Sequence, residues 1–275
     1  MKWKNWSLDF SEKTYVMGIL NVTPDSFSDG GRFNNQKTAV ERAQEMVEQG
    51  ADIIDVGGES TRPGFEKVDG EEECNRVIPI IEKLSATLNV PISIDTYKAE
   101  TAKRAIEAGA DIINDVWGAK ADSDMAQVAA QYSTPIILTH NRDNTDYNDI
   151  MSDILKDIQE SLAICREAGV TEERIILDPG IGFAKTYDQN LEVMRRLEEF
   201  TALDYPVLLG TSRKSLISKT LDLPAQDRIE GTGATISLGI ERGAHIVRVH
   251  DVLEMSRTVK MMDAMLGKGK VKTVG

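Results

Sequence analysis

Polar side chains end three copies of one sequence frame. The frame runs Gly, Ala, a polar residue and two β-branched residues, and it ends on Asp55, Asn114 or Arg248. A helix end, a Gly stop and a short buried strand would produce this frame. Because side chains alternate along a strand, each ending residue should face the same way as the isoleucine two positions before it. The sequence therefore predicts that three strand ends converge on one polar site.

Residues near the strand ends suggest binding of two different chemical groups. Asp95, Asn114 and Asp178 offer acceptors and an amide, which suit a flat heterocycle that presents N–H and amino donors. Three cationic or ionisable side chains suit an oxygen-rich anion: Lys214, Arg248 and His250. In the segment 212–215, the start of a helix adds positive potential. We expect a pocket that is rich in acceptors at one end and cationic at the other.

Each residue also has an alternative interpretation. Asp95 or Asp178 could cap the helix that follows its strand. Arg248 could pair with Asp251, and His250 could be a surface histidine whose hydrogen bonds are satisfied. The prediction of a site rests on the joint placement of these residues.

The segment 178–183, Asp-Pro-Gly-Ile-Gly-Phe, strengthens the prediction, because Pro and Gly allow close backbone approach and Phe offers an aromatic face. The hydrolase elbow, the P-loop and the dinucleotide fingerprint are absent from the sequence. Its three histidines and two cysteines lack metal-ligand spacing. Mg²⁺ held mainly by substrate phosphate oxygens and water is the natural metal for such a site.

Eight apolar runs suited to buried strands recur along the chain: 15–20, 52–56, 92–95, 111–114, 135–139, 174–178, 206–210 and 245–249. Segments of helical period lie between them, such as 36–49, 70–88, 98–108, 149–168, 188–201 and 227–242. This alternation predicts a single (β/α)8 TIM barrel over residues 1–275, with a doubly wound open sheet as the alternative. The polar residues then fall at the carboxyl ends of strands, the face that carries active sites in such barrels. Long loops after the first two strands, 21–35 and 57–70, should cover that face.

The composition of the chain limits the classes of binding partner that it can have. A net charge of -13 disfavours nucleic acid and anionic membranes, which need a basic surface. With no long apolar run and no apolar stretch at the start, we expect a cytoplasmic protein. Residues 267–275 are expected to form a flexible tail.

Seven segments, in this order and spacing, resemble dihydropteroate synthase: Ile19-Leu20-Asn21-Val22-Thr23-Pro24-Asp25-Ser26-Phe27-Ser28-Asp29-Gly30-Gly31, Asp55-Val56-Gly57-Gly58-Glu59-Ser60-Thr61-Arg62-Pro63-Gly64, Ser93-Ile94-Asp95-Thr96, Ile113-Asn114-Asp115, Asp178-Pro179-Gly180-Ile181-Gly182-Phe183, Ser212-Arg213-Lys214-Ser215 and Arg248-Val249-His250-Asp251. The first two are the most specific, and the resemblance spans Gly18 to Asp251. Pterin-binding methyltransferases are a related alternative, but they are not expected to carry the first two loops. The second alternative is a paralogue that binds pterin without catalysing a reaction.

The resemblance implies an enzyme that transfers alkyl or aryl groups (EC 2.5.1.15) in folate biosynthesis. It would condense 6-hydroxymethyl-7,8-dihydropterin pyrophosphate with p-aminobenzoate to give 7,8-dihydropteroate and pyrophosphate. The resemblance also implies Mg²⁺ as cofactor, a homodimer, and sulfonamides as competitors of p-aminobenzoate.

Site residues follow from the resemblance by position. The pterin would be held by Asp95, Asn114, Asp178 and Lys214. The pyrophosphate would be held by Asn21, Arg248 and His250, with Asn21 also on Mg²⁺. The p-aminobenzoate side would comprise Thr61, Arg62, Pro63, Phe183, Lys214 and Ser215. The loop that closes over the site would include Asp25, Ser26, Phe27, Asp29 and Gly30. The catalytic set would be Asp95, Asp178, Lys214 and Arg248.

An aniline nucleophile needs no activating base, so departure of pyrophosphate is the harder step. We therefore expect a dissociative displacement, in which Mg²⁺, Arg248 and His250 stabilise the leaving group and Asp95 and Asp178 stabilise a cationic pterin.

Overall fold

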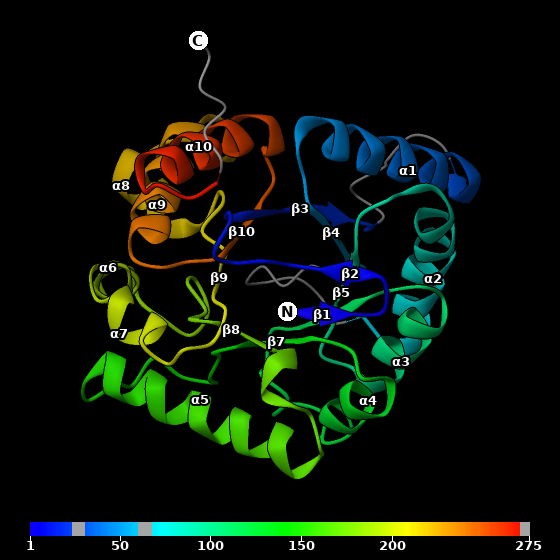
Figure 1. Cartoon of the computed structure of the whole chain (residues 1–275), viewed down its shortest axis with the longest axis horizontal. Helices are drawn as coiled ribbons and strands as arrows, with labels where there is room; N and C mark the ends of the chain where they lie inside the picture. Colours follow the sequence, from blue (N-terminus) through cyan, green and yellow to red (C-terminus); the bar gives the residue numbers. More distant parts are fainter. Residues whose placement is uncertain (24–30, 60–67, 270–275) are drawn as a thin grey trace.

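A ring of parallel strands forms the centre of the computed structural model, which describes residues 1–23, 31–59 and 68–269 (Figure 1). The strands are β3 (Tyr15–Asn21), β4 (Ile53–Gly57), β5 (Ile92–Asp95), β6 (Ile112–Asp115), β7 (Ile136–Thr139), β8 (Ile175–Asp178), β9 (Leu208–Leu209) and β10 (Ile246–Val249). Their order is β8-β7-β6-β5-β4-β3-β10-β9, and a parallel bridge from Leu177 to Val207 joins the two ends. The predicted (β/α)8 barrel is confirmed, and the open doubly wound sheet is wrong.

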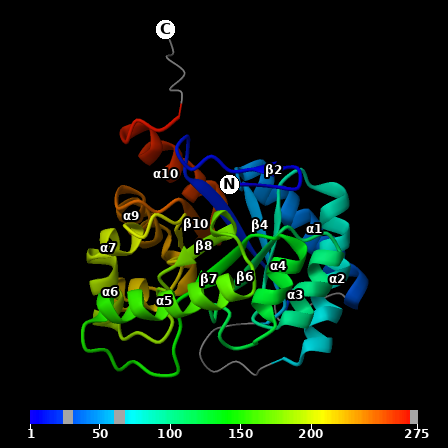
Figure 2. The same cartoon turned by 60° about the horizontal axis from the view of Figure 1, so that its bottom comes forward.

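Helices surround this ring on the outside (Figures 1 and 2). They are α1 (Gly31–Gln49), α2 (Gly70–Thr87), α3 (Ala99–Glu107), α4 (Met125–Tyr132), α5 (Ile150–Glu167), α6 (Tyr187–Arg195), α7 (Leu197–Thr201), α8 (Ser215–Leu221), α9 (Ile229–Glu241) and α10 (Val252–Met265). The helix expected over 188–201 is broken at Arg196, whose φ of -108° and ψ of 20° are not helical. The strand expected over 206–210 is shorter, Leu208–Leu209, and Val207 joins Leu177 through an isolated bridge.

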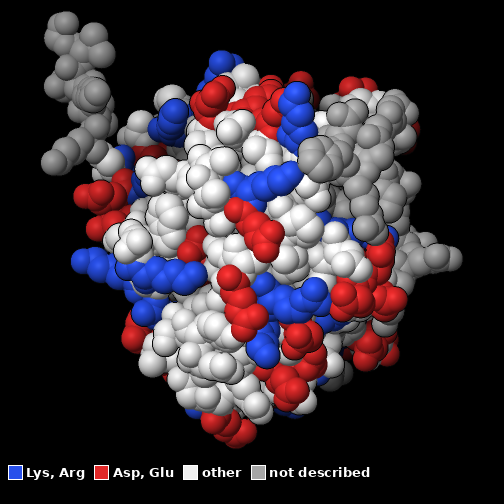
Figure 3. Space-filling view, turned by 90° about the vertical axis from the view of Figure 1, so that its right-hand side faces the viewer, with Lys and Arg blue, Asp and Glu red and all other residues white. Residues whose placement is uncertain are grey.

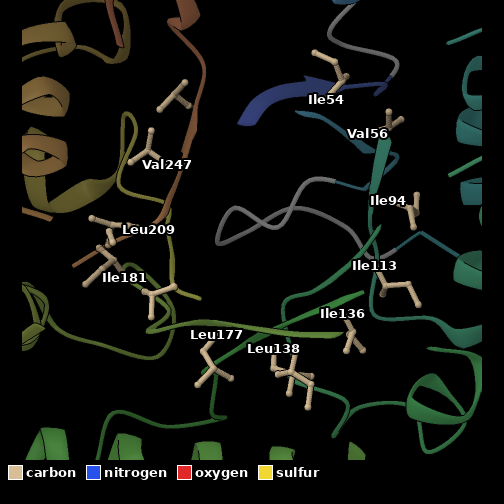
Figure 4. Packing of buried hydrophobic residues seen from close by; sticks show 14 of the residues in the cluster. Ile54, Val56, Ile94, Ile113, Ile136, Leu138, Leu177, Ile181, Leu209 and Val247 are labelled. Carbon is tan, nitrogen blue, oxygen red and sulfur yellow. The ribbon is translucent and has the colours of Figure 1, made fainter. Parts of the chain in front are cut away.

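Two apolar cores follow from the alternation of side chains along the strands. The larger core lies between the sheet and the helices, and Figure 4 shows Ile94, Ile113 and Leu138 pointing outward toward it. The smaller core fills the barrel and contains Met17, Ile53, Ile112, Ile137, Ile176, Leu208 and Ile246. The predicted facing of Ile53, Ile112 and Ile246 is therefore confirmed, and the residue two positions after each lies one layer nearer the carboxyl end of the strands.

A hairpin that was not predicted from the sequence covers the amino end of the barrel. It pairs β1 (Lys2–Trp3) with β2 (Trp6–Ser7), and it lies at the same end of the molecule as the last turn of α10 (Figure 2). Trp3 is buried against the inner core. The hairpin therefore closes the inner apolar core at the amino end of the barrel.

Acidic and basic side chains are interspersed on the surface shown in Figure 3. Arg104 of α3 pairs with Glu71 of α2 at 2.9 Å. Of the helices in the described ranges, none is long and apolar enough to cross a membrane. The amide of Lys268 donates to the Asp263 carbonyl at 2.8 Å, so the chain beyond α10 stays attached to it as far as Lys268. Residues 270–275 of the expected tail lie outside the described residues.

Candidate active site

The three residues of the repeated frame meet at the carboxyl end of the barrel. Arg248 Nε donates to Asp55 Oδ2 at 2.6 Å, and Asn114 Nδ2 donates to the same oxygen at 3.1 Å. A second nitrogen of Arg248, Nη2, donates to Asp95 Oδ2 at 2.6 Å. The predicted convergence is therefore confirmed. The alternative partner of Arg248 is wrong, because Asp251 pairs instead with Arg213.

Parallel pairing explains why these side chains meet. Asp95 lies beside Asn114 in the register of β5 and β6, and Asp55 lies beside Ser93 in that of β4 and β5. The shared inward facing then places the carboxylates over the apolar layer, where Asp55 is fully buried. Neither Asp95 nor Asp178 caps a following helix, because the N-cap residues are Lys98 and Thr186.

This cluster at the carboxyl end of the barrel contains buried side-chain oxygens without a partner in the described part of the protein. Within the described residues, Asp55 Oδ1, Asp95 Oδ1 and Ser93 Oγ are buried and have no hydrogen-bond partner. Because buried polar atoms in native proteins are almost always paired, these oxygens fit the N–H and amino donors of a ligand. This supports the prediction of a flat heterocycle with several donors.

A second group of residues comes from the loops after β8 and β9. Lys214 Nζ donates to the Ile181 carbonyl, and it lies 4.6 Å from the centroid of the Phe183 ring. A methyl group built on Gly210 would lie 3.8 Å from Lys214 Nζ and 4.0 Å from Asp178 Oδ2, so both groups border one space. The structure thus brings Asp178, Phe183 and Lys214 together as predicted.

Burial shifts the pKa of three of these groups in the direction of neutral pH. It raises the pKa of Asp95 to about 7, although the Arg248 guanidinium opposes the shift. It raises the pKa of Asp178 too, against the charge of Lys214. It lowers the pKa of Lys214 to about 8, opposed by Asp178. Ionisable groups whose pKa is shifted by burial and by a charged neighbour are typical of functional sites.

The residues expected around the pyrophosphate lie at the ends of two neighbouring strands, β3 and β10, which pair in the sheet. Asn21 ends β3, and a methyl group built on Gly57 would lie 3.7 Å from Asn21 Oδ1 and 3.6 Å from Asp95 Oδ2. After β10, His250 Nδ1 lies 3.0 Å from Ser212 Oγ. Ser215 begins α8 and is exposed. These positions place Asn21, Arg248 and His250, the residues expected to bind the anion, at neighbouring strand ends.

Eight predicted site residues lie outside the described residues: Thr61, Arg62, Pro63, Asp25, Ser26, Phe27, Asp29 and Gly30. The described ends of the second loop are joined, because Glu59 Oε2 accepts from the Val68 amide at 3.4 Å and from Lys98 Nζ at 2.6 Å.

A magnesium ion carried by the substrate would fit this rim. In the described part of the chain, no group of three His, Cys, Asp or Glu side chains could hold a metal alone. The amide oxygen of Asn21 would supply one oxygen ligand, because Mg²⁺ commonly takes the rest from phosphate and water.

Sequence reasoning missed two features of this site. Asp55 was expected at the site but without a role, and it accepts from both Arg248 and Asn114. Lys185 was not singled out, yet its ammonium contacts His140 at the end of β7. The repeated frame indicated the position of Asp55 but not its partners, and nothing in the local sequence marks Lys185.

Replacing Gly180 with alanine should lower the free energy of unfolding by at least about 2 kcal/mol and reduce ligand binding. Gly180 has φ +69°, and an added Cβ would lie 1.9 Å from the His140 carbonyl oxygen, so the backbone must move. Urea unfolding measures the effect. As a control, Gly169→Ala also has a positive φ, +89°, but its Cβ meets nothing within 4 Å. Equal losses in the two variants would contradict the steric argument.

The fold and this rim define a (β/α)8-barrel protein with a polar site that is acceptor-rich on one side and cationic on the other. Comparison with known proteins identifies the family. The family described as pterin binding enzyme matches residues 17–250. The dihydropteroate synthase of Bacillus subtilis is 60% identical over 265 residues, which cover 96% of this chain and 93% of that protein.

Solved structures agree. A dihydropteroate synthase from Clostridium difficile, crystallised in the presence of pteroic acid, has a TM-score of 0.93 and 53% identity and covers 94% of this chain and 99% of its own. The Yersinia pestis enzyme, in a sulfonamide drug complex, has a TM-score of 0.91 and 38% identity. The match covers 97% of this chain and 99% of that chain. The chain therefore belongs to the pterin binding enzyme family, as one of its dihydropteroate synthases.

Proposed function

We propose that this chain condenses 6-hydroxymethyl-7,8-dihydropterin pyrophosphate with p-aminobenzoate, giving 7,8-dihydropteroate and pyrophosphate. The observation that carries the proposal is the buried cluster of Asp55, Asp95, Asn114 and Arg248, in which Asp55 Oδ1 and Asp95 Oδ1 have no partner among the described residues. The relatives support it, since the similar structures include one with pteroic acid, a compound with both a pterin and an aminobenzoate part. A methyltransferase or a paralogue without catalysis finds no such support.

The pterin ring lies against the acceptor side of the site. Asp95 and Asp178 accept its N–H and amino hydrogens, and Asn114 can both donate and accept. Lys214 borders the same space as Asp178 and also lies over Phe183, so it joins the pterin side to the p-aminobenzoate side. The p-aminobenzoate side is completed by Thr61, Arg62, Pro63 and Ser215, and sulfonamides compete there.

The chemistry breaks the bond between the pterin methylene carbon and the pyrophosphate oxygen. The electron pair leaves with pyrophosphate, and the amine nitrogen of p-aminobenzoate forms the new bond and then loses a proton. Arg248 and His250 hold the leaving oxygens, while Asp95 and Asp178 stabilise positive charge on the pterin. Arg248 suits both ends of this step, because Nε and Nη2 already hold Asp55 and Asp95 at the pterin side. Asn21, with the substrate phosphates, would hold Mg²⁺, which supplies charge neutralisation of the leaving group.

A dissociative route predicts a change in the isotope distribution of the substrate that has not reacted. With p-aminobenzoate absent, an isotope of oxygen placed in the bridging position should appear in non-bridging positions of recovered pterin pyrophosphate. If none scrambles while pyrophosphate is able to return to the carbon, displacement is concerted.

The function itself is tested by following both products. Pyrophosphate release that depends on p-aminobenzoate and matches dihydropteroate formation would support a synthase. Tight binding of the pterin pyrophosphate with no product, in the presence of Mg²⁺, would overturn the proposal.

Pterin affinity should depend on pH through Asp95. Its carboxyl gives up its proton as the pH rises through about 7, so the ionised acceptor is present above that pH and lost below it. The affinity for 6-hydroxymethylpterin, which has no phosphate to titrate, should therefore fall up to about 10-fold per pH unit below about 7. Calorimetric titration between pH 5.5 and 7.5 measures this. Asp95→Asn should remove the slope, and a slope that persists in this variant would assign the ionisation elsewhere.

A homodimer is a further part of the proposal. Large apolar side chains are exposed on α8, on α9, on α10 and just beyond α8 and α10: Leu221, Leu223, Leu238, Met261, Met265 and Leu266. Such a surface suits contact with a second copy of the chain. Sedimentation at several concentrations tests it, and a monomer at all of them would contradict it.

A further inference from the structure

A lysine with three acceptors lies behind the ligand-facing residues. Lys185 Nζ contacts His140 Nδ1 at 2.9 Å, the Gly180 carbonyl at 2.9 Å and the Phe183 carbonyl at 3.1 Å. An ammonium group has three donors and no acceptor. Burial lowers the pKa of Lys185 to about 7. Below that pH Lys185 is an ammonium whose three donors are all matched, and two of them fix the backbone of one loop.

His140 is fully buried and is held between partners of opposite kind. Its Nε2 lies 3.0 Å from Asp157 Oδ2, and Arg142 Nε donates to the same oxygen at 2.5 Å. A carboxylate only accepts and an ammonium only donates, so Nε2 carries the proton and Nδ1 accepts from Lys185. Burial, with the charge of Lys185, lowers the pKa of His140 to about 3 and keeps the ring neutral.

The loop that Lys185 holds carries the ligand-facing groups. The Gly180 amide donates to Asp178 Oδ1 at 2.7 Å, so the turn orients that carboxylate. The Ile181 carbonyl accepts from Lys214, and the Phe183 ring lies under the same ammonium. The Gly180 and Phe183 carbonyls, which flank these groups, are the two that Lys185 holds.

We propose that Lys185 is a positioning residue, whose ammonium, oriented by neutral His140, sets the turn 180–183 and through it Asp178 and Lys214. This inference rests on the proposed function. It assigns no substrate contact to Lys185. Its removal should affect both substrates, because Asp178 lies on the pterin side and Phe183 on the p-aminobenzoate side.

Steady-state kinetics of Lys185→Met test the role. We expect kcat/KM to fall about 100-fold, with KM raised for both substrates, since a misplaced group costs about this much. Lys185→Arg, which keeps a cation with several donors, should recover part of the loss. Lys156→Met, on the exposed face of α5, is the control and should keep wild-type kinetics. Wild-type kinetics in Lys185→Met would overturn the proposal.

Nitrogen-15 NMR of the histidine rings tests the network without relying on activity. The chain has three histidines, so the spectrum can be assigned with single substitutions. At pH 6, His140 should be neutral and protonated on Nε2. In Lys185→Met its pKa should rise, because a positive neighbour is gone while Asp157, Arg142 and Lys120 remain. A proton on Nδ1 in the wild type would overturn the network.

Different results would refute the proposed function and the positioning role of Lys185. A wild-type protein that forms no dihydropteroate, yet shows the expected His140 tautomer, would refute the proposed function alone. An active wild type with an equally active Lys185→Met variant would refute the positioning role alone. If Lys185→Met does not fold, Lys185→Arg and the wild-type NMR spectrum still decide the matter.

Discussion

Arg248→Met should lower the free energy of unfolding by about 3–5 kcal/mol, because removing one partner of a buried ion pair leaves uncompensated charge. Asp55 is fully buried and Asp95 nearly so, and both bind the same guanidinium. Without it, two carboxylates would face each other in a site with little water. The pKa of Asp95 should rise further above 7, since the charge that opposes its protonation is lost.

Urea unfolding at pH 7.5 measures this effect. Arg166→Met is the control, because Arg166 pairs with Glu172 on the surface and such pairs contribute at most about 1 kcal/mol. Adding Asp55→Asn to Arg248→Met should restore part of the stability by removing one stranded charge, but it should not restore activity. Similar losses for Arg248→Met and Arg166→Met would mean that the central ion pairs do not hold the site together.

Asp95→Asn should lower kcat/KM by about 10²–10³-fold, the range found when one preorganised electrostatic group is removed. The amide keeps the shape of the carboxylate but not its charge. It therefore offers one neutral acceptor in place of a charged carboxylate, and it does not stabilise the positive charge that develops when pyrophosphate departs. Arg248 still has Asp55, so the loss of stability should be smaller than in Arg248→Met.

Asp263→Asn is a matched control for Asp95→Asn. Asp263 is also buried, but it lies near the amino end of the barrel, where it binds the Thr14 amide and hydroxyl at 2.8 and 2.7 Å. Its substitution should reduce stability and leave kcat/KM unchanged. If Asp95→Asn kept kcat/KM within a few-fold of the wild type, Asp95 would have no part in the chemistry.

The sequence was enough to predict the barrel and much of the site, for a physical reason. Strand alternation has a period of two, so a frame repeated at three strand ends fixes three side chains on one face. Closure of the sheet then brings Asp55, Asn114 and Arg248 together. The N-cap interpretation of Asp95 and Asp178 could be rejected only from the structure, because both helices begin several residues later.

Other features depend on contacts between distant segments. Arg213 adopts φ +60° and pairs with Asp251, which leaves Arg248 for Asp55 and Asp95, and no sequence pattern distinguishes these choices. The three acceptors of Lys185 come from two loops, and two of them are backbone carbonyls. Residues 61–63 and 25–30 lie outside the described residues, so their predicted roles stay predictions.

The most direct test of the account is a crystal structure of the protein with 6-hydroxymethylpterin. We expect the N–H and amino edge of the ring to lie within hydrogen-bonding distance of Asp95, Asn114 and Asp178, with Lys214 beside it and with Asp95 Oδ1 newly paired. A ring bound elsewhere, or bound with Asp95 Oδ1 still unpaired, would contradict the central claim that this strand-end cluster is the pterin site.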